Sequence, residues 1–412
     1  MREFVVSRLT MVSLFTGAGG IDIGFEEAGF GVTLCVEMDP LCRKTLALNR
    51  PKWRQSSVHD ATELTKEAFM SELNLRPREL SALVGGPPCQ PFSKSSQWAP
   101  NGARGFDDPR ARTVVAFFKV LGWTLPRIVM IENVPGFVSG DLSASIVERF
   151  RRVNRNHKTK YRPTLVRVNA ADYGVPQKRE RILIIAERSG KQFILPSPTH
   201  GPDAPEAYMT AWDAFKGLRK PSDDSLSIAN TKWGGLLPSI PEGMNYLWHT
   251  PRMDGLPLFG WRTKYWNFLL KLAKNEPAPT VQASAGPATG PFHWENRRLT
   301  TRELARLQTF PDSWRFSGSV RRQEMQIGNA MPPALAELIA LELRRQLLGE
   351  RVRRRARLIP ERRSRAGAPT QPMPVPTCYR HLEANHPPHP GTGLGPAHAR
   401  RRNMLGKADS GM

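Results

Sequence analysis

The residue of this sequence best suited to chemistry is Cys89, in a stretch (83–93) that reads LVGGPPCQPFS. Two glycines end an apolar run, and three prolines surround the thiol. Glycine frees the backbone and proline stiffens it, so we expect a rigid loop at the end of a strand, with the thiol at its tip. A lone cysteine is more often a buried structural residue, but the glycines and prolines around Cys89 favour a nucleophile. Such a nucleophile must act as the thiolate.

An acid and two arginines stand at the ends of other predicted strands. The apolar segment 127–131 ends at Glu132, and Arg179 and Arg181 precede the predicted strand 182–186. Alternate residues of an extended chain share a face, so both guanidiniums should point the same way. Ligands of open α/β sheets bind at the strand ends. We therefore expect the thiol, the acid and the guanidiniums to face one crevice, a set suited to a planar polar substrate with anionic neighbours.

The N-terminal region has the pattern of a nucleotide-binding α/β unit. A predicted strand at 12–15 runs into the glycine-rich turn TGAGG (16–20) and then a helix. A second strand, 32–36, ends at Glu37, where Rossmann-type folds hold ribose hydroxyls. Asp60 could accept a hydrogen bond from an adenine amino group, or could cap a helix. The pattern leaves open a dinucleotide or another adenosine ligand.

The composition indicates a polyanionic partner and excludes several other classes. The 412 residues include 60 Lys and Arg against 37 Asp and Glu, a formal net charge of +23, which is typical of proteins that bind nucleic acid. The four cysteines fit no zinc pattern, so no metal site is expected. We find no signal peptide and no apolar stretch that could span a bilayer, and we expect a cytoplasmic protein without a membrane partner.

Changes in composition divide the chain into four parts. Residues 1–187 alternate strand and helix patterns and are predicted to form the catalytic and cofactor-binding α/β domain. Residues 188–278 hold Pro/Gly turns, five tryptophans and scattered basic residues, typical of a smaller, irregular recognition domain. Residues 279–349 return to helical periodicity and complete the first domain. Residues 350–412 are rich in proline and arginine and are predicted to be a disordered basic tail, whose deletion should spare catalysis.

Taken together, these motifs resemble the DNA (cytosine-5)-methyltransferase family of the bacterial restriction–modification type. They occur in the family's order from residue 14 to about 348: LFTGAGG (14–20), VEMDP (36–40), GGPPCQPFS (85–93), ENV (132–134), QKRER (177–181), RRLTTRELARLQTFPD (297–312) and QIGNAMPP (326–333). The resemblance implies an α/β fold with a Rossmann-like sheet that binds S-adenosyl-L-methionine. It also implies that 188–278 is a target-recognition domain.

The resemblance implies roles for individual residues. Cys89 would attack carbon 6 of a cytosine flipped out of duplex DNA, Glu132 would hold N3 and the exocyclic amine, and Arg181, with Arg179 behind it, would hold the base carbonyl. The implied cofactor-binding residues are Phe15, Gly17, Ala18, Gly19, Glu37, Met38, Asp60, Pro88 and Asn329. The candidate DNA-binding residues are Gln90, Ser93, Arg252, Arg262 and Lys264.

Three functions remain compatible with the sequence. The first is a monomeric DNA methyltransferase, the modification half of a restriction–modification pair with a cognate endonuclease. The second is an RNA cytosine-5 methyltransferase of the same superfamily, because the chemistry on RNA cytosine is identical. The third is a catalytically inactive DNA-binding homologue, against which the intact set of Cys89, Glu132 and Arg181 argues. The large tryptophan-rich segment favours duplex DNA over RNA, and the target sequence is left open.

Overall fold

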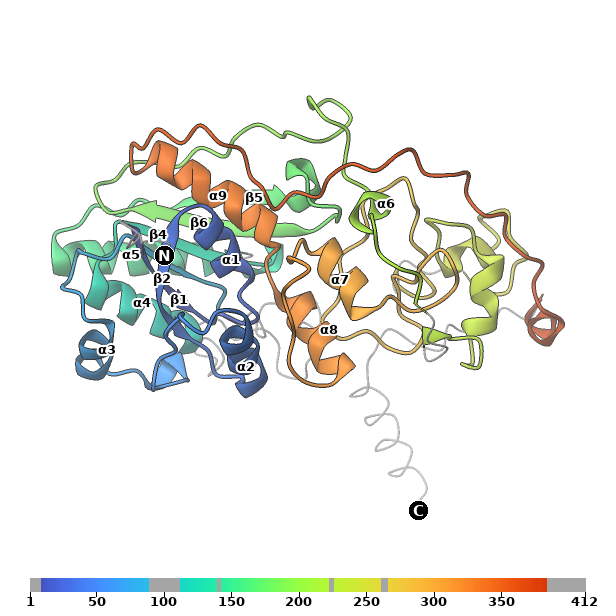
Figure 1. The fold of residues 1–412 in the computed structure, drawn as a ribbon, viewed down its shortest axis with the longest axis horizontal. Coiled ribbons are helices and arrows are strands. Elements are labelled where there is room, and N and C mark those ends of the chain that lie inside the picture. Colours follow the sequence, from blue (N-terminus) through green and yellow to red (C-terminus); the bar gives the residue numbers. More distant parts are fainter. Residues whose placement is uncertain (1–8, 89–111, 139–141, 222–225, 261–265, 384–412) are drawn as a thin grey trace, which may run out of the picture.

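The computed structural model describes residues 9–88, 112–138, 142–221, 226–260 and 266–383. Its centre is a six-stranded sheet of order β2-β1-β3-β4-β6-β5 (Figure 1). The first four of these strands run parallel to one another, and β6 is antiparallel to both of its neighbours. The strands are β1 (Leu9–Leu14), β2 (Phe30–Val36), β3 (Ala82–Gly85), β4 (Ile128–Asn133), β5 (Thr164–Asn169) and β6 (Glu180–Glu187).

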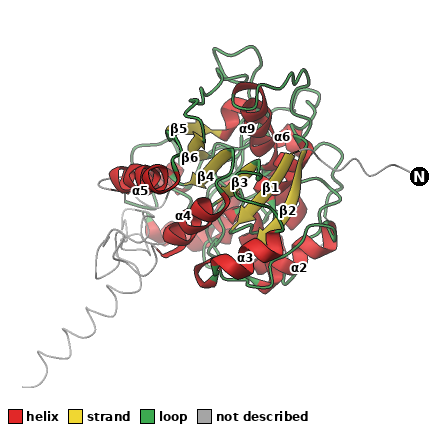
Figure 2. Cartoon of the chain, turned by 90° about the vertical axis from the view of Figure 1, so that its left-hand side faces the viewer, coloured by secondary structure: helices red, strands yellow, loops and turns green. Residues whose placement is uncertain are grey.

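Helices cover both faces of the sheet (Figure 2). Strand residues alternate between two apolar clusters: Leu83 belongs to one, while its neighbours Ala82 and Val84 belong to the other. The first cluster also includes residues of α3, α4 and α5, and the second those of α1 and α9. The predicted α/β class is confirmed. The helices are α1 (Gly20–Glu27), α2 (Pro40–Asn49), α3 (Lys66–Leu73), α4 (Arg112–Thr124), α5 (Leu142–His157), α6 (Ala211–Ala214), α7 (Thr301–Leu307), α8 (Val320–Asn329) and α9 (Pro333–Gln346).

The first and last helices touch backbone to backbone. A Cβ atom added to Gly24 of α1 would lie 2.4 Å from the backbone nitrogen of Glu337 in α9 and 2.5 Å from the carbonyl oxygen of Pro333. Only glycine permits this approach, and it lets α9 pack against the sheet beside α1. The C-terminal part of the chain therefore returns to the sheet formed by the N-terminal part. No helix in the described ranges is long and apolar enough to cross a membrane.

A separate apolar cluster forms a smaller lobe at one end of the molecule (Figure 1). Its buried members come from two stretches, Ile228 to Phe292 and Leu382, and we call 226–292 the smaller lobe. Its described residues form short 3-10 turns and isolated bridges, as expected from a sequence rich in Pro/Gly turns. Earlier residues of the predicted recognition segment pack elsewhere. Phe193 belongs to the second apolar cluster, with α1 and α9, and Phe215 packs with α7.

The C-terminal tail differs from the prediction in its first part. Residues 350–383 are described, and they run as an extended segment over the surface to the smaller lobe (Figure 1). Val352, Ala356 and Leu358 pack against the second apolar cluster, which holds α1 and α9. Arg353, Arg355 and Arg357 between them are exposed. So few apolar residues give no periodic signal, which is why the sequence predicts disorder here. Residues 384–412 lie outside the described ranges.

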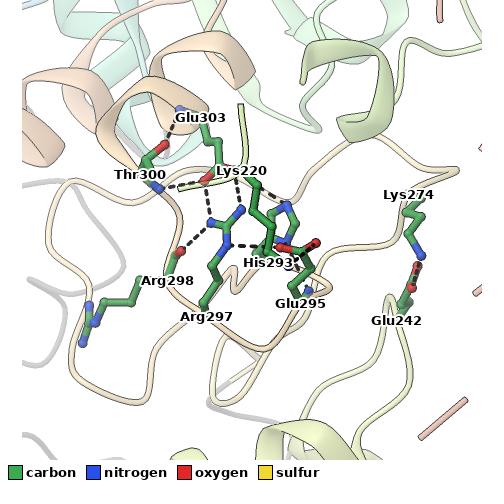
Figure 3. A network of polar contacts seen from close by, with 9 residues as sticks. All are labelled: Lys220, Glu242, Lys274, His293, Glu295, Arg297, Arg298, Thr300 and Glu303. Atoms are coloured by element: carbon green, nitrogen blue, oxygen red, sulfur yellow. Dashed lines mark hydrogen bonds and ion pairs between the residues drawn. The ribbon is translucent and has the colours of Figure 1, made fainter. Parts of the chain in front are cut away.

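A buried ion pair stabilises the start of α7 (Figure 3). Arg297 donates to both carboxylate oxygens of Glu303, at 2.9 and 2.7 Å, and the two side chains are only 13% and 6% exposed. Glu303 also closes a capping box with Thr300, the N-cap residue of α7. The same carboxylate therefore neutralises a buried guanidinium and satisfies the helix N-terminus.

We expect Glu303→Ala to lower the free energy of unfolding by about 3–5 kcal/mol, because it removes the closer acid partner of the buried Arg297 and breaks the capping box. Arg297 is then left with Glu295 alone, at 3.5 Å. Glu276→Ala is the matched control, since it breaks the exposed Lys178–Glu276 pair and should cost about 0–1 kcal/mol. Urea unfolding followed by circular dichroism measures both. Equal shifts for the two variants would show that the buried pair contributes no more than a surface pair.

Candidate active site

A cavity of about 630 Å³ opens at the carboxyl ends of β1, β2, β3 and β4. Its wall includes Phe15, which follows β1, Glu37, which follows β2, and Pro88, three residues beyond β3. Glu132, near the end of β4, lies in the same wall. Parallel strands end at one edge of a sheet, so segments far apart in the sequence converge there.

The cavity brings together most of the residues that the sequence singles out. Gly19 is an exception: its φ is +84°, and an added Cβ would lie 2.9 Å from Leu46 and 3.2 Å from Trp314, so this glycine faces the packed core. Arg252 is an exposed residue of the smaller lobe. The predicted residues that line the cavity are Phe15, Gly17, Ala18, Glu37, Met38, Asp60, Pro88, Glu132, Arg179, Arg181 and Asn329. Cys89, Gln90, Ser93, Arg262 and Lys264 lie outside the described residues.

The glycine turn and Glu37 form one end of the cavity. Phe15 and Gly17 both have a positive φ, of 57° and 58°, and together they turn the chain sharply after β1. This conformation is strained for Phe15 and free of strain for Gly17. The carboxylate of Glu37 accepts hydrogen bonds from the backbone N–H of Gly17 (2.6 Å) and of Asp39 (2.7 Å). Burial raises the pKa of Glu37, and these two bonds oppose the rise. The carboxylate is therefore held in one orientation, and each oxygen keeps a lone pair for a further donor.

Asp60 caps a short turn and also lines the cavity. It is the N-cap of a short 3-10 turn, where its Oδ1 accepts from the backbone N–H and the hydroxyl of Thr62, both at 2.8 Å. It also lines the cavity. Met38, 66% exposed, lies on the same wall and offers an apolar surface. A glycine turn, two acids and an apolar side chain are the groups that hold an adenosine ligand.

An ion pair between Glu132 and Arg181 forms the other end of the cavity. Arg181 Nε lies 2.6 Å from Glu132 Oε1, and the side chains are 10% and 11% exposed. The two residues come together because β4 and β6 pair antiparallel, with Glu132 opposite Leu183. A buried carboxylate beside a fixed guanidinium can bind the donor and acceptor edge of a planar base.

The chain matches the family described as C-5 cytosine-specific DNA methylase over residues 9–345. It belongs to this family. The chain is 33% identical over 371 residues to the type II methyltransferase M.SacI of Streptomyces achromogenes, covering 82% of this chain and 93% of that protein. It is 34% identical over 353 residues to M1.HphI of Haemophilus parahaemolyticus, covering 81% and 86%. The solved structure of a protein encoded within an Escherichia coli prophage shares the fold, with a TM-score of 0.60, 24% identity, and coverage of 83% of this chain and 100% of that one. The predicted enzyme class, DNA (cytosine-5)-methyltransferase, is thereby confirmed.

Arg179 of this methylase stabilises the loop around Asn329 in the cavity wall. It lines the wall beside Arg181, as the predicted alternation requires, but its side chain is fully buried. Its Nη2 donates to the carbonyl oxygens of Gly328 (2.6 Å) and Ala330 (2.9 Å), the two neighbours of Asn329. Arg179 therefore fixes the loop that presents Asn329 to the cavity, a contact across 150 residues that the sequence does not reveal.

Asn133 and Gly86 of the methylase position the loop that leads to Cys89, and the sequence does not reveal the contacts of either residue. Asn133 Nδ2 donates to the carbonyl oxygen of Pro87 at 2.9 Å, which ties this loop to β4. A Cβ added to Gly86 would lie 3.0 Å from Glu132 Oε2. Gly86 belongs to the motif GGPPC and Asn133 to the motif ENV. Only the pairing of β3 with β4 brings these two motifs together.

We expect Gly86→Ala to lower kcat by about tenfold, because the added methyl group displaces Glu132 by a few tenths of an ångström and a misplacement of about 1 Å costs roughly 100-fold. Gly122→Ala is the control, since its added Cβ would make only an ordinary contact of 3.5 Å with His157. Steady-state methylation kinetics measure both variants. A Gly86→Ala enzyme with unchanged kcat would show that Glu132 is not sensitive to its position.

Proposed function

We propose that this protein transfers a methyl group from S-adenosyl-L-methionine to carbon 5 of a cytosine flipped out of duplex DNA, through a covalent adduct of Cys89 at carbon 6. The observation that carries the proposal is the composition of one cavity. An adenosine-type site lies at one end, and the buried Glu132–Arg181 pair lies at the other. The chain from β3 passes beside Glu132 three residues before Cys89.

The residues present fit S-adenosyl-L-methionine. Gly17, with open space where a Cβ would stand, lets a ligand approach the backbone. Glu37 would hold the ribose hydroxyls, Met38 would cover the adenine face, and Asp60 would accept from the adenine amino group. When bound, this cofactor supplies an electrophilic methyl group. The chain's part is to hold the reactants in line and to exclude water.

The protein side chains supply the activation of the base. Carbon 5 of cytosine is a poor nucleophile, and attack of the Cys89 thiolate at carbon 6 pushes electron density onto carbon 5. Glu132 donates to N3 and accepts from the exocyclic amine, so it stabilises the charge that develops as sulfur adds. Arg181 holds the base carbonyl and keeps Glu132 in place. After methyl transfer, the proton on carbon 5 leaves to a base and the thiolate is eliminated, which restores the aromatic ring.

The predicted target-recognition segment, 188–278, includes most of the smaller lobe (226–292), and we propose that this lobe reads the DNA sequence. The basic surface of the chain is suited to DNA phosphates. A net charge of +23 supplies sequence-independent affinity, while base contacts select the site. We propose that the protein acts as a monomer in the cytoplasm and modifies the site that a cognate restriction endonuclease would cut. Its type II relatives support this role.

The test is to incubate the protein with methyl-labelled S-adenosyl-L-methionine and either duplex DNA or tRNA, and then to digest the nucleic acid to nucleosides. The expected result is label in 5-methyldeoxycytidine from the DNA and none in the tRNA. Label only in RNA, or on the exocyclic nitrogen of cytosine or adenine, would overturn the proposal. Sequencing of methylated DNA from an expressing host then gives the target site.

A further inference from the structure

Residues 350–383 form a C-terminal strap that crosses from the sheet domain to the smaller lobe (Figure 1). The family match ends at residue 345, so the strap lies beyond the family's shared region. The chain already passes between the two parts on entering and leaving the smaller lobe, and the strap is a further crossing. Three sets of contacts attach it to the rest of the protein.

The first attachment is to α9. Glu337 is fully buried, and its Oε2 accepts the backbone N–H groups of Arg357 (2.8 Å) and Leu358 (2.9 Å). The guanidinium of Arg354 pairs with Oε1 of the same carboxylate. All three partners belong to the strap. A carboxylate without them would be buried and unpaired, which is costly, so this end of the strap is firmly held.

The second attachment is at the junction between the sheet domain and the smaller lobe. The guanidinium of Arg363 lies 3.5 Å from the centre of the Trp212 ring, a close cation–π contact. The backbone N–H of Arg363 donates to Asp213 (2.8 Å), and Trp212 Nε1 donates to the carbonyl oxygen of Ser364 (2.9 Å). Trp212 in turn packs against Trp294, with ring centres 6.0 Å apart. The strap is thus fixed at α6, which precedes the smaller lobe in the chain.

The third attachment is within the smaller lobe. The backbone N–H of Thr370 donates to Glu242 Oε1 at 3.0 Å, the same oxygen that pairs with Lys274 in Figure 3. Tyr379 stacks on Trp233, with an interplanar angle of 20°. Leu382 is buried in the apolar cluster of the lobe. The end of the strap is therefore part of the lobe's own core.

We propose that the strap is a positioning element for DNA methylation, which holds the smaller lobe at a fixed orientation relative to the catalytic cavity. Domains joined only by linkers move relative to one another by default, and a further crossing attached on both sides restricts that motion. Under the proposed function, on which this inference rests, recognition contacts from the lobe must be in register with the cavity that receives the flipped base. Arg363 and Tyr379 are positioning residues in this sense, since their contacts are with tryptophans of the protein.

The test is a cut in the strap that removes no contact. Residues 365–369 join the second and third attachments and are mostly exposed, so a protease site inserted after Gly367 can be cleaved with both attachments in place. The control carries the same site after Glu383, where cleavage leaves the strap whole. Fluorophores at two exposed residues, Glu67 of α3 and Asp254 of the smaller lobe, report the distance between the two parts by single-molecule energy transfer.

Cleavage after Gly367 is expected to broaden the distance distribution and to lower the preference for the target site over other cytosines by about tenfold, since small misalignments of reacting groups are costly. The affinity for S-adenosyl-L-methionine should stay within about twofold, because the strap is not part of the cavity wall. An unchanged distance distribution, or equal broadening in the control, would overturn the inference. The distance measurement tests the role of the strap even if the protein methylates no DNA. A lack of methylation would count against the proposed function and not against this role.

Discussion

Cys89→Ala is expected to abolish methyl transfer to DNA, with a fall in rate on the order of 10⁴-fold or more, as for other enzymes that lose their nucleophile. Without sulfur at carbon 6, carbon 5 of cytosine stays unreactive, and neither Glu132 nor Arg181 can supply the missing bond. Binding of S-adenosyl-L-methionine should be unchanged, because the proposed contacts to the cofactor come from Gly17, Glu37 and Asp60. Label incorporation into duplex DNA and titration calorimetry with the cofactor measure the two effects separately.

DNA that contains 5-fluorocytosine gives a second measurement of the same prediction. The fluorine cannot leave as the proton does, so the adduct is trapped and survives a denaturing gel. The adduct should form in the native protein and be missing in Cys89→Ala.

Cys42 also lines the cavity, but burial raises its pKa, so it stays protonated and is a poor nucleophile. An adduct that persists in Cys89→Ala would show that another thiol is the nucleophile, and Cys378→Ala, at an exposed thiol, is the control for cysteine replacement itself.

Glu132→Gln is expected to lower kcat by roughly 10²–10⁴-fold, the usual contribution of a positioned acid or base. Glutamine keeps the shape of the side chain but cannot protonate N3, and it loses the charge that pairs with Arg181 at 2.6 Å. Single-turnover methylation at saturating DNA isolates this step from product release.

Glu180→Gln is the matched control for this variant. Glu180 is adjacent to Arg181 in sequence but is exposed on the opposite side of β6, where it pairs with Arg167 at 2.7 Å. Loss of an exposed pair has little effect, so this variant should methylate DNA at the native rate. Similar losses in both variants would indicate that any carboxylate near Arg181 affects the rate, and would contradict a specific role for Glu132.

The sequence by itself determined the sheet edge and most of the residues that gather there. Strand, glycine turn and helix are local patterns, set by backbone freedom and by side-chain alternation within a few residues. Glu37 and Glu132 could be placed because each stands at or near the carboxyl end of an apolar strand, and these ends meet at one edge of an α/β sheet. Arg181 stands at the start of its strand, and it reaches the same edge only because β6 runs antiparallel to β4. The capping box at Thr300 is also a local pattern, because its partner Glu303 is only three residues away.

Only the tertiary structure decided the contacts between segments distant in the chain. Gly19 fits the cofactor motif, yet packing against Leu46 and Trp314 explains why it must be glycine. Arg179 fits a substrate-binding motif, yet its guanidinium holds the carbonyl groups on either side of Asn329. The strap has the composition of a disordered tail, but it is held by a buried carboxylate on α9 and by tryptophans that the rest of the fold presents. Such partners have no signature in the strap's own sequence, because their position exists only once the sheet domain and the smaller lobe have formed.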